Sequence, residues 1–379
     1  MYQMPRHAAD LDCGVGHISA ARAGTFERRG CSAVSGKGWG LMGKKGFPAL
    51  LALWLLLSGC TASVPPEAAF APPPEDRLVI YTSHKEEVYD PIVKEFQART
   101  GIWVEVIAGG TNELLERISD ESGDPACDVM FGGGVESLSA YADCFQPYVC
   151  RDDDCLNATG RSPDNLWTPF SSLPIVLIYN TRLVAPGEIT GWSDLLREQW
   201  RGRIALADPT ISGSGYTAVR TLMSCLPGDP WDTLTRFVEN LDGNILPDSG
   251  DIAESVRSGS CYVGITLEET ALKARDKGAD LAIVYPREGT SAVPDGGALV
   301  SGAPHLENAK AFLDFVLGYD VQKLLVSSLF RRSVRTDIPE PEDLPTESEL
   351  GVINYDISVT GGQKEEFIRR WQELLGETP

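Results

Sequence analysis

Two blocks of alternating strand and helix patterns constrain the fold of this chain more than any other feature of its sequence. In the first block, β-rich runs over 77–83, 103–108 and 129–131 alternate with helical patterns over 88–96, over 112–120 and from 136. In the second block, runs over 203–207, 261–266 and 281–285 alternate with helical patterns that begin near 214, 231 and 268. This alternation predicts an α/β protein in which crossover helices join parallel strands.

The two blocks predict two lobes, each a mainly parallel sheet flanked by helices, joined by two crossing strands. The strand-like run 174–180 follows an irregular stretch over 145–172, so we place the first crossing there. We expect 281–285 to carry the chain back, and helices over 306–317, 320–328 and 364–375 to complete the first lobe. The predicted boundaries are therefore 77–173 and 288–379 for lobe 1, and 174–287 for lobe 2.

An export signal precedes these blocks. Lys44 and Lys45 come before the apolar run 47–57, which ends in Leu57-Ser58-Gly59-Cys60. A charged start, a short apolar stretch and small residues before the cut are typical of a signal peptide, here 42–59, and the run is too short to span a membrane. We expect Cys60 to become the first mature residue and to carry a lipid, and 1–41 to be untranslated or disordered.

The Pro-rich stretch 60–76 that follows predicts an extended tether between lipid and folded body. The expected location is therefore the extracytoplasmic cell envelope, which is the periplasm in a Gram-negative cell. The formal net charge of −21 argues against nucleic acid as a partner, because that binding depends on neutralising phosphates.

Six cysteines follow Cys60, an even number in an exported chain, and this favours disulfides. Six cysteines allow 15 pairings. Proximity in the predicted elements suggests Cys225 with Cys261, Cys150 with Cys155 and Cys127 with Cys144. Zinc is the alternative, but the spacings contain no CxxC pair and do not suit it.

Small polar residues follow the predicted strands, where ligands bind in open α/β sheets. Backbone amides and hydroxyls in such turns donate hydrogen bonds to anions. The predicted ligand-binding residues are Ser83, His84, Gly110, Thr111, Gly133, Gly134, Ser212, Gly213, Ser214, Ser249, Thr266 and Glu268.

Structural roles are open for several of these residues. Ser212 to Ser214 would also serve to cap the helix that begins there, which is compatible with binding. His84 would also suit an exposed loop. Glu268 and Glu269 open a helix, where carboxylates are favoured by the helix dipole alone; the alternative is that Glu268 accepts hydrogen bonds from ligand hydroxyls or an amine.

The segments 79–87 (VIYTSHKEE), 95–111 (EFQARTGIWVEVIAGGT), 212–217 and 264–268 resemble bacterial ABC-transporter substrate-binding proteins of the ferric-iron, phosphonate and sugar-phosphate group. The resemblance extends over about 77–337. It implies the two-lobed, type II periplasmic-binding fold, closure on ligand by a hinge, and docking to a membrane permease driven by an ATPase.

The same resemblance bears on the ligand. Ferric-iron members use adjacent tyrosines just after the strand that matches 261–266, where this chain has Leu267-Glu268-Glu269-Thr270. This departure favours a phosphorylated sugar or phosphonate over iron, and no metal or cofactor is expected. The similar sugar-phosphate binders keep a carboxylate near Glu268 for sugar hydroxyls.

An enzyme is the competing class. His84 and His305 are the histidines that follow the signal peptide, and no GxSxG, P-loop or HExxH motif is present. A carboxylate-based hydrolase and a solute sensor remain alternatives. The sequence favours a monomeric, non-enzymatic solute-binding lipoprotein of an ABC importer.

Overall fold

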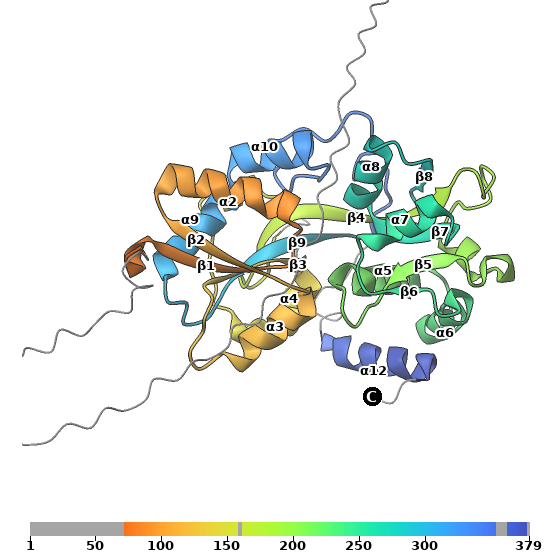
Figure 1. Ribbon diagram of the computed structural model, residues 1–379, viewed down its shortest axis with the longest axis horizontal. Helices are drawn as coiled ribbons and strands as arrows, with labels where there is room; N and C mark the ends of the chain where they lie inside the picture. The colour runs from red at the N-terminus through yellow and green to blue at the C-terminus, as the bar shows by residue number, and fades with distance from the viewer. Residues whose placement is uncertain (1–71, 158–160, 354–361, 377–379) are drawn as a thin grey trace, which may run out of the picture. The chain divides into compact units, whose positions relative to one another are not determined.

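Two buried strands, β4 (Thr168–Asn180) and β9 (Ala292–Leu299), connect the two halves of one sheet (Figure 1). The computed structural model describes residues 72–157, 161–353 and 362–376. The strand order is β2-β1-β3-β9-β4-β7-β5-β6, and β8 also pairs with β4. Strand β4 pairs with β9 over Thr168–Pro174 and with β7 from Ile175 onward, so one continuous strand belongs to both lobes.

Lobe 1 is built on the parallel strands β2, β1 and β3, with β9 antiparallel to β3. Its elements are β1 (Arg77–Thr82), α2 (Glu86–Thr100), β2 (Trp103–Ala108), α3 (Thr111–Asp120), β3 (Val129–Gly134), α4 (Val135–Ala140), α9 (Leu306–Leu317) and α10 (Tyr319–Ser328). The apolar face of α2 packs with α9 and α10 on one side of the sheet, and the apolar face of α3 packs on the other. The predicted helical periodicity thus buries one stripe of each helix.

Lobe 2 is built on β7, β5 and β6, which are parallel, with β4 antiparallel to β7 and β8. Its elements are β5 (Ile204–Ala207), α5 (Gly213–Cys225), α6 (Pro230–Leu241), β6 (Ile245–Leu246), α7 (Asp251–Ser258), β7 (Val263–Leu267), α8 (Glu268–Asp276) and β8 (Leu281–Val284). Alternate residues of β4 enter separate cores, Ile175 and Leu177 on the face of α5 and α6, Val176 and Ile178 on the face of α7. Both faces are therefore covered, as in parallel sheets generally.

The return crossing differs from the sequence prediction. The run 281–285 forms β8, which pairs with β4 inside lobe 2, and β9 carries the chain back instead. The sequence of β9 contains Pro294, Gly296 and Gly297, residue types that are uncommon inside strands, so its pattern does not predict a strand. A Cβ at Gly296 would lie 2.7 Å from the carbonyl oxygen of Thr168, so glycine permits the close strand pairing at this crossing.

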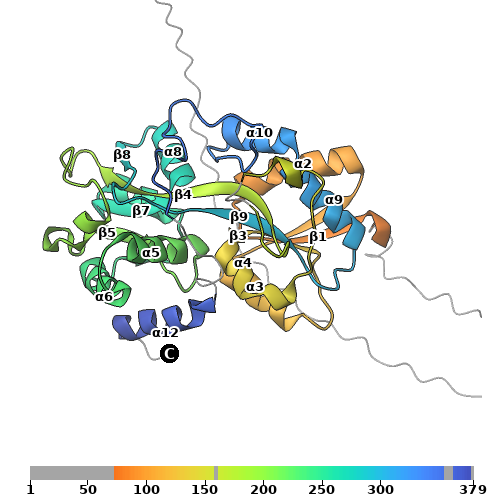
Figure 2. The ribbon, with the colours of Figure 1, turned by 180° about the vertical axis from the view of Figure 1, so that it is seen from behind.

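The C-terminal helix α12 (Lys364–Leu375) also differs from the prediction, which assigned it to lobe 1. Phe367 and Trp371 pack in the lobe 2 core with Tyr216 and Leu234. Both ribbon views place the helix beside α5 and α6 (Figures 1 and 2). The other predicted boundaries, at 173/174 and 287/288, stay predictions.

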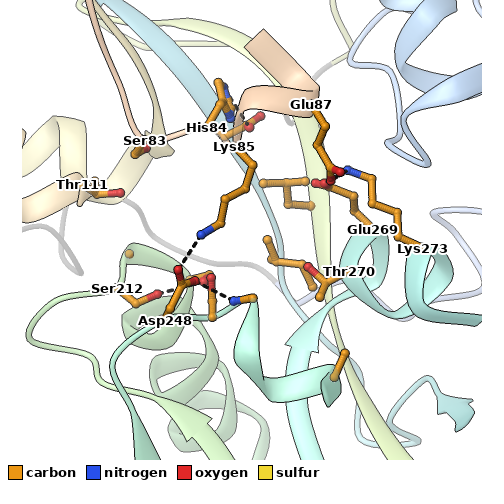
Figure 3. Close-up of a pocket in the computed structure, with 18 of the residues that line it drawn as sticks. Ser83, His84, Lys85, Glu87, Thr111, Ser212, Asp248, Glu269, Thr270 and Lys273 are labelled. Carbon is orange, nitrogen blue, oxygen red and sulfur yellow. Dashed lines mark hydrogen bonds and ion pairs between the residues drawn. The ribbon is translucent and has the colours of Figure 1, made fainter. Parts of the chain in front are cut away.

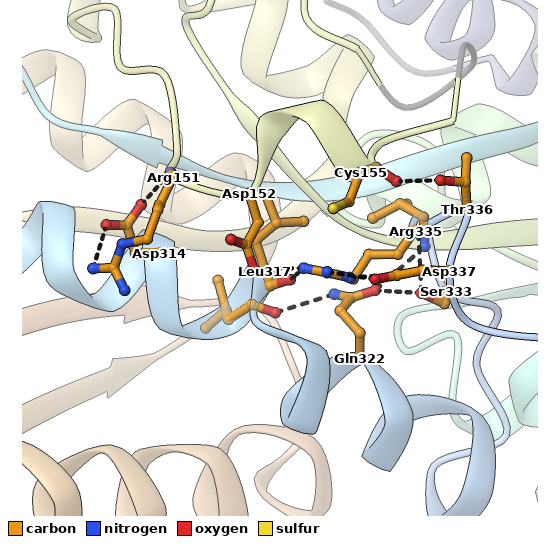
Figure 4. Close-up of polar contacts among 12 residues, drawn as sticks. Arg151, Asp152, Cys155, Asp314, Leu317, Gln322, Ser333, Arg335, Thr336 and Asp337 are labelled. Carbon is orange, nitrogen blue, oxygen red and sulfur yellow. Dashed lines mark hydrogen bonds and ion pairs between the residues drawn. The ribbon is translucent and has the colours of Figure 1, made fainter.

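The irregular stretch before β4 is fixed to the segment after α10 by polar contacts (Figure 4). Arg335 donates through Nη1 to Asp152 Oδ2 at 2.7 Å and through Nε and Nη2 to Asp337, each at 2.8 Å. Thr336 Oγ1 donates to the carbonyl oxygen of Cys155 at 3.0 Å. Because the buried guanidinium has acceptors on both sides, this polar loop lies on the core without an unpaired charge.

The three predicted disulfides are absent. All six cysteines after Cys60 are free thiols in the structure. Cys225 packs on the α5 and α6 face of the lobe 2 sheet, whereas Cys261 packs on the α7 face, so the sheet itself separates that pair. Cys150 instead contacts the hydroxyl of Thr168, with Sγ and Oγ1 3.3 Å apart.

The signal peptide, Cys60 and most of the tether lie outside the described residues. Among the helices that the structure describes, none is both long and apolar enough to span a membrane.

Gly215 should be one of the positions at which lobe 2 tolerates no side chain. A Cβ there would lie 2.4 Å from the carbonyl oxygen of Ala207 in β5, which is backbone and cannot rotate away. We expect Gly215→Ala to lower the free energy of unfolding by about 1–3 kcal/mol, measured by denaturant unfolding. Gly123→Ala is the control, because a Cβ at Gly123 meets nothing within 4 Å; equal stability of the two variants would contradict the packing.

Candidate functional site

A cavity of about 1060 Å³ lies between the two lobes, where the turns after the strands of both lobes face one another (Figure 3). Lobe 1 contributes the turns after β1, β2 and β3, and lobe 2 contributes the turn before α5, the turn before α7 and the start of α8. Ten of the twelve predicted ligand-binding residues line it, namely Ser83, His84, Gly110, Thr111, Gly133, Gly134, Ser212, Gly213, Ser214 and Ser249.

Five helices of eight or more residues begin at this cavity, and the short helix α4 also begins there, after Gly134. The residues that cap α2, α3, α5, α7 and α8 are Lys85, Gly110, Ser212, Gly250 and Leu267, and all of them line the cavity. The backbone N–H groups of a helix's first turn carry a partial positive charge. First-turn carboxylates offset part of it, as Glu113 does by accepting from the N–H of Gly110 at 3.4 Å.

Glycine is required at position 133, where a turn of lobe 1 packs against Thr111. Gly133 has a φ of 87°, and a Cβ on it would lie 2.6 Å from Cγ2 of Thr111. A Cβ on Gly213, from lobe 2, would lie 3.4 Å from Oγ1 of the same residue. Thr111 therefore sits between a turn of each lobe: Gly133 gives it the room that a side chain would take, and Gly213 lies in ordinary contact with it across the lobes.

Two ion pairs cross the cavity beside α2. Lys85 Nζ lies 2.6 Å from Asp248 Oδ2, and Lys273 Nζ lies 2.8 Å from Glu87 Oε1 (Figure 3). In the first pair the lysine belongs to lobe 1 and the carboxylate to lobe 2. In the second pair the lysine belongs to lobe 2 and the carboxylate to lobe 1. Three of the four side chains are about half exposed, so each pair is worth little in water and is sensitive to salt.

Two predicted residues do not line the cavity. Glu268 is buried beside β8, where its carboxylate accepts from Nε of Arg332 at 2.7 Å, from Nη2 of Arg332 at 2.8 Å and from Tyr285 Oη at 2.7 Å. These contacts fix Glu268 in a structural pair away from the cavity wall, so the structure lends no support to its ligand role, which stays a prediction. Thr266 is buried within β7 and is likewise absent from the cavity wall.

The next residue, Glu269, lines the cavity instead and belongs to a buried charge cluster that the sequence analysis missed. Arg331 Nη2 lies 2.6 Å from Glu269 Oε2, and Arg331 Nη1 donates to Asp295 Oδ2 at 2.5 Å. Lys273 Nζ donates to Glu269 Oε1 at 2.5 Å. One feature of the sequence could have indicated this cluster: the two adjacent arginines Arg331 and Arg332 have the opposite charge to the two adjacent carboxylates Glu268 and Glu269.

Burial sets the charge states in this cluster. It raises the pKa of Asp295 above its usual value, an effect that the nearby Arg331 guanidinium opposes. Burial also lowers the pKa of His84 well below its usual value, and the charges of Arg331 and Lys273 lower it further. His84 is therefore neutral, with Nε2 3.7 Å from Asp295 Oδ2, and it faces the cavity rather than lying in an exposed loop.

The two-lobed α/β fold with a cavity between the lobes is the type II fold of periplasmic binding proteins, to which the structural neighbours belong. Residues 78–331 match the family described as bacterial extracellular solute-binding protein, and the chain belongs to this family. Members of that family bind solutes in ABC import and are not enzymes, so this chain is an extracytoplasmic binding protein.

Three proteins that resemble this chain illustrate the comparison. Iron uptake protein A1 of Synechocystis is 26% identical over 302 residues, which cover 75% of this chain and 83% of that protein. A probable ABC transporter periplasmic-binding protein of Sinorhizobium fredii is 28% identical over 307 residues, 78% and 82% of the two chains. The periplasmic binding protein AfuA of Actinobacillus pleuropneumoniae, with fructose-6-phosphate bound, has a TM-score of 0.74 at 24% identity and covers 80% and 99% of the two chains. The resemblance drawn from the sequence is confirmed at the level of family and fold.

Arg331 should be a stability determinant, because it joins α8 to the crossing strand β9. Replacing it with methionine leaves the carboxylates of Asp295 and Glu269 buried with one partner fewer. We expect Arg331→Met to lower the free energy of unfolding by about 3–5 kcal/mol, measured by denaturant unfolding. The matched control is Arg369→Met, which removes an exposed arginine of α12; a loss of similar size in that variant would contradict the assignment.

Proposed function

We propose that this protein captures a small anionic solute bearing a phosphate or phosphonate group, a phosphorylated sugar above all, and delivers it to the permease and ATPase of an ABC importer. The observation that carries the proposal is the convergence of five helix N-termini and several hydroxyl-bearing turns on one cavity. Oxyanions are bound well by such groups, because amide N–H groups and hydroxyls donate in many directions without a counter-charge.

The charges of the cavity wall support neutral donors as the anion-binding groups. Four of the five lysine and arginine side chains of the wall, Lys85, Arg257, Lys273 and Arg331, are each paired with a carboxylate of the wall. The fifth, Lys277, is exposed and has no ion pair within the described part of the chain. The turns that carry Ser83, Thr111 and Ser212 to Ser214 therefore supply most of the groups that are free to meet the anion. The chain's net charge of −21 does not oppose this, because the field inside a cleft of aligned amides differs from that of the whole surface.

The part of the cavity wall at the start of α8 suits the sugar portion of a sugar phosphate. Glu269 takes the position that the sequence analysis gave to Glu268, a cavity-facing carboxylate at the start of α8. Arg331 and Lys273 each contact one oxygen of Glu269, and because a carboxylate has about four lone-pair sites, Glu269 keeps the capacity to accept from ligand hydroxyls or an amine. The fructose 6-phosphate bound to the structural neighbour AfuA is a solute of this kind.

Ferric iron is the second candidate, because a relative is named an iron uptake protein. Fe(III) favours hard oxygen donors, and phenolates were the expected ones. Among the described residues of the cavity wall, Tyr89 is the single tyrosine, and the described part of the chain holds no group of three or more His, Cys, Asp or Glu suited to a metal. These features favour the oxyanion over iron.

A thermal-shift screen of the chain from Glu75 should separate the two candidates, because a ligand bound only by the native state raises the melting temperature. We expect fructose 6-phosphate, or 2-aminoethylphosphonate, to raise it, and Ser214→Ala to weaken that solute's binding by about tenfold. Ser258→Ala, an exposed serine outside the cavity, should bind as the unmodified chain does. A rise with Fe(III) citrate alone would replace the phosphate proposal with the iron one.

We also propose that the protein acts as a monomer anchored by a lipid on Cys60, with 60–76 as the tether. The support is the basic and apolar sequence before Leu57-Ser58-Gly59-Cys60 and the family's extracytoplasmic location.

Lipid attachment should be visible in cells that express the full chain. We expect metabolic labelling with palmitate to mark the protein and membrane fractionation to find it in the pellet. Cys60→Ala should abolish both, whereas Cys144→Ala, a half-buried cysteine of the folded body, should abolish neither. Labelling that survives Cys60→Ala would show that the lipid is elsewhere.

A further inference from the structure

Helix α12 lies outside residues 78–331, the part that matches the family, yet it is firmly seated on lobe 2. The Phe367 ring meets Tyr216 of α5 edge to face, with centroids 5.0 Å apart. The Arg370 guanidinium lies 4.1 Å from the centroid of the Trp231 ring of α6. Trp371 is fully buried in the same core. These aromatic contacts make α12 part of lobe 2 along most of its length.

The first residue of α12 contacts the other lobe. Lys364 Nζ donates to Asn112 Oδ1 at 2.7 Å and to Ser137 Oγ at 3.0 Å. Asn112 belongs to α3 and Ser137 to α4, both in lobe 1. The lysine is 5% exposed, so its charge is withdrawn from water and depends on these acceptors. One helix therefore holds groups from both lobes.

Asn112 connects this contact to the cavity. Its Nδ2 donates to the carbonyl oxygen of Thr210 at 2.6 Å, in the lobe 2 turn that leads into α5. Asn112 is thus held by lobe 2 through two separate segments, and its neighbour Thr111 lines the cavity. Beside it, Thr217 of α5 donates through Oγ1 to the buried carboxylate of Glu136 in α4. The interlobe contact on this flank is a continuous hydrogen-bonded seam.

We propose that α12 is a strap that stabilises the closed arrangement of the two lobes, and that Lys364 is a positioning residue for solute capture. It acts through Asn112, which fixes the Gly110–Thr111 turn against the lobe 2 turn at Thr210. Apparent affinity scales with the fraction of molecules that are already closed. The strap raises that fraction before any solute arrives, so the inference holds whichever solute the cavity takes.

The ionisation of Lys364 gives the strap a pH dependence. Burial lowers the pKa of Lys364 to about 8, an effect that the carboxylates of Glu136 and Glu116 oppose. The other titratable groups near it are Tyr216, whose pKa burial raises, and Arg220. Opening returns the amine to water and its pKa toward 10.5. Closure therefore releases a proton between about pH 8 and 10.5, so rising pH in this window favours the closed form.

The test uses the chain from Glu75 without solute. We expect Lys364→Met to shift the closed-to-open ratio by about tenfold, because it leaves Asn112 Oδ1 and Ser137 Oγ in the closed form without the donor that the amine supplies. The shift should appear as a larger radius of gyration in small-angle X-ray scattering and as faster hydrogen exchange of the amides at 110–114. Arg369→Met is the matched control, since that arginine is exposed on the same helix and forms its ion pair with Glu373 along it.

A second variant separates the strap from general damage. Asn112→Ala keeps α12 and Lys364 but removes the link to Thr210, so it should open the lobes as Lys364→Met does, with the near-ultraviolet circular dichroism of Trp371 and its neighbours retained. From pH 8 to 10 the radius of gyration of the unmodified chain should fall, and that of Lys364→Met should not. Unchanged scattering and exchange in both variants would overturn the strap; opening in Asn112→Ala alone would overturn the role of Lys364.

Discussion

The ladder between β4 and β9 is the constraint on which the arrangement of both lobes depends. Strand β4 gives its first half to the lobe 1 sheet and its second half to the lobe 2 sheet, without a break. Both strands are buried, so their backbone groups have no water to replace lost ladder bonds. Relative motion of the lobes must therefore bend this ladder rather than break it, and contacts away from it decide how far the cavity closes.

The two Arg–Glu pairs stand next to that ladder. Arg332 pairs with Ser172 of β4 through the backbone and with Glu268 of α8 through its side chain. Arg331 contacts β9 and α8 through its side chain alone, by Asp295 and Glu269. Buried pairs of this kind add little net stability, but breaking one is costly. We infer that their main effect is to fix the start of α8, and with it Glu269, relative to the crossing strands.

The local pattern of the sequence predicted much of the fold, because strands and helices are specified by short-range periodicity. The runs 103–108 and 306–317 coincide with β2 and α9. The two elements that differ from the prediction, β9 and α12, depend on contacts with residues far away in the sequence. Strand β9 (AVPDGGAL) has proline and glycine where its neighbours are closest, so its sequence looks like a loop. Helix α12 has a strong apolar face, but the face alone does not say which core receives it.

The candidate site shows the same division. Turns after strands were predictable, since chain direction places them on one edge of a sheet, and most of the predicted residues do line the cavity. Glu268 and Glu269 were not separable by sequence. Consecutive helical residues point about 100° apart, so one meets Arg332 in the protein and the other meets the cavity. Which of the two glutamates faces the cavity is decided by the positions of Arg331 and Arg332, which lie more than 60 residues later in the sequence.

Most cations of the cavity wall are paired with carboxylates, and this has a consequence for how a solute would be held and released; Lys277 is the exception within the described residues. A wall made mainly of unpaired lysine or arginine would attract any anion over long range and would bind it strongly in both open and closed forms. Amide and hydroxyl donors act only at contact distance, and here they belong to turns of both lobes. An oxyanion would then be bound fully only when the lobes are closed. Affinity would be coupled to closure, and opening by a membrane partner would be enough to release the solute.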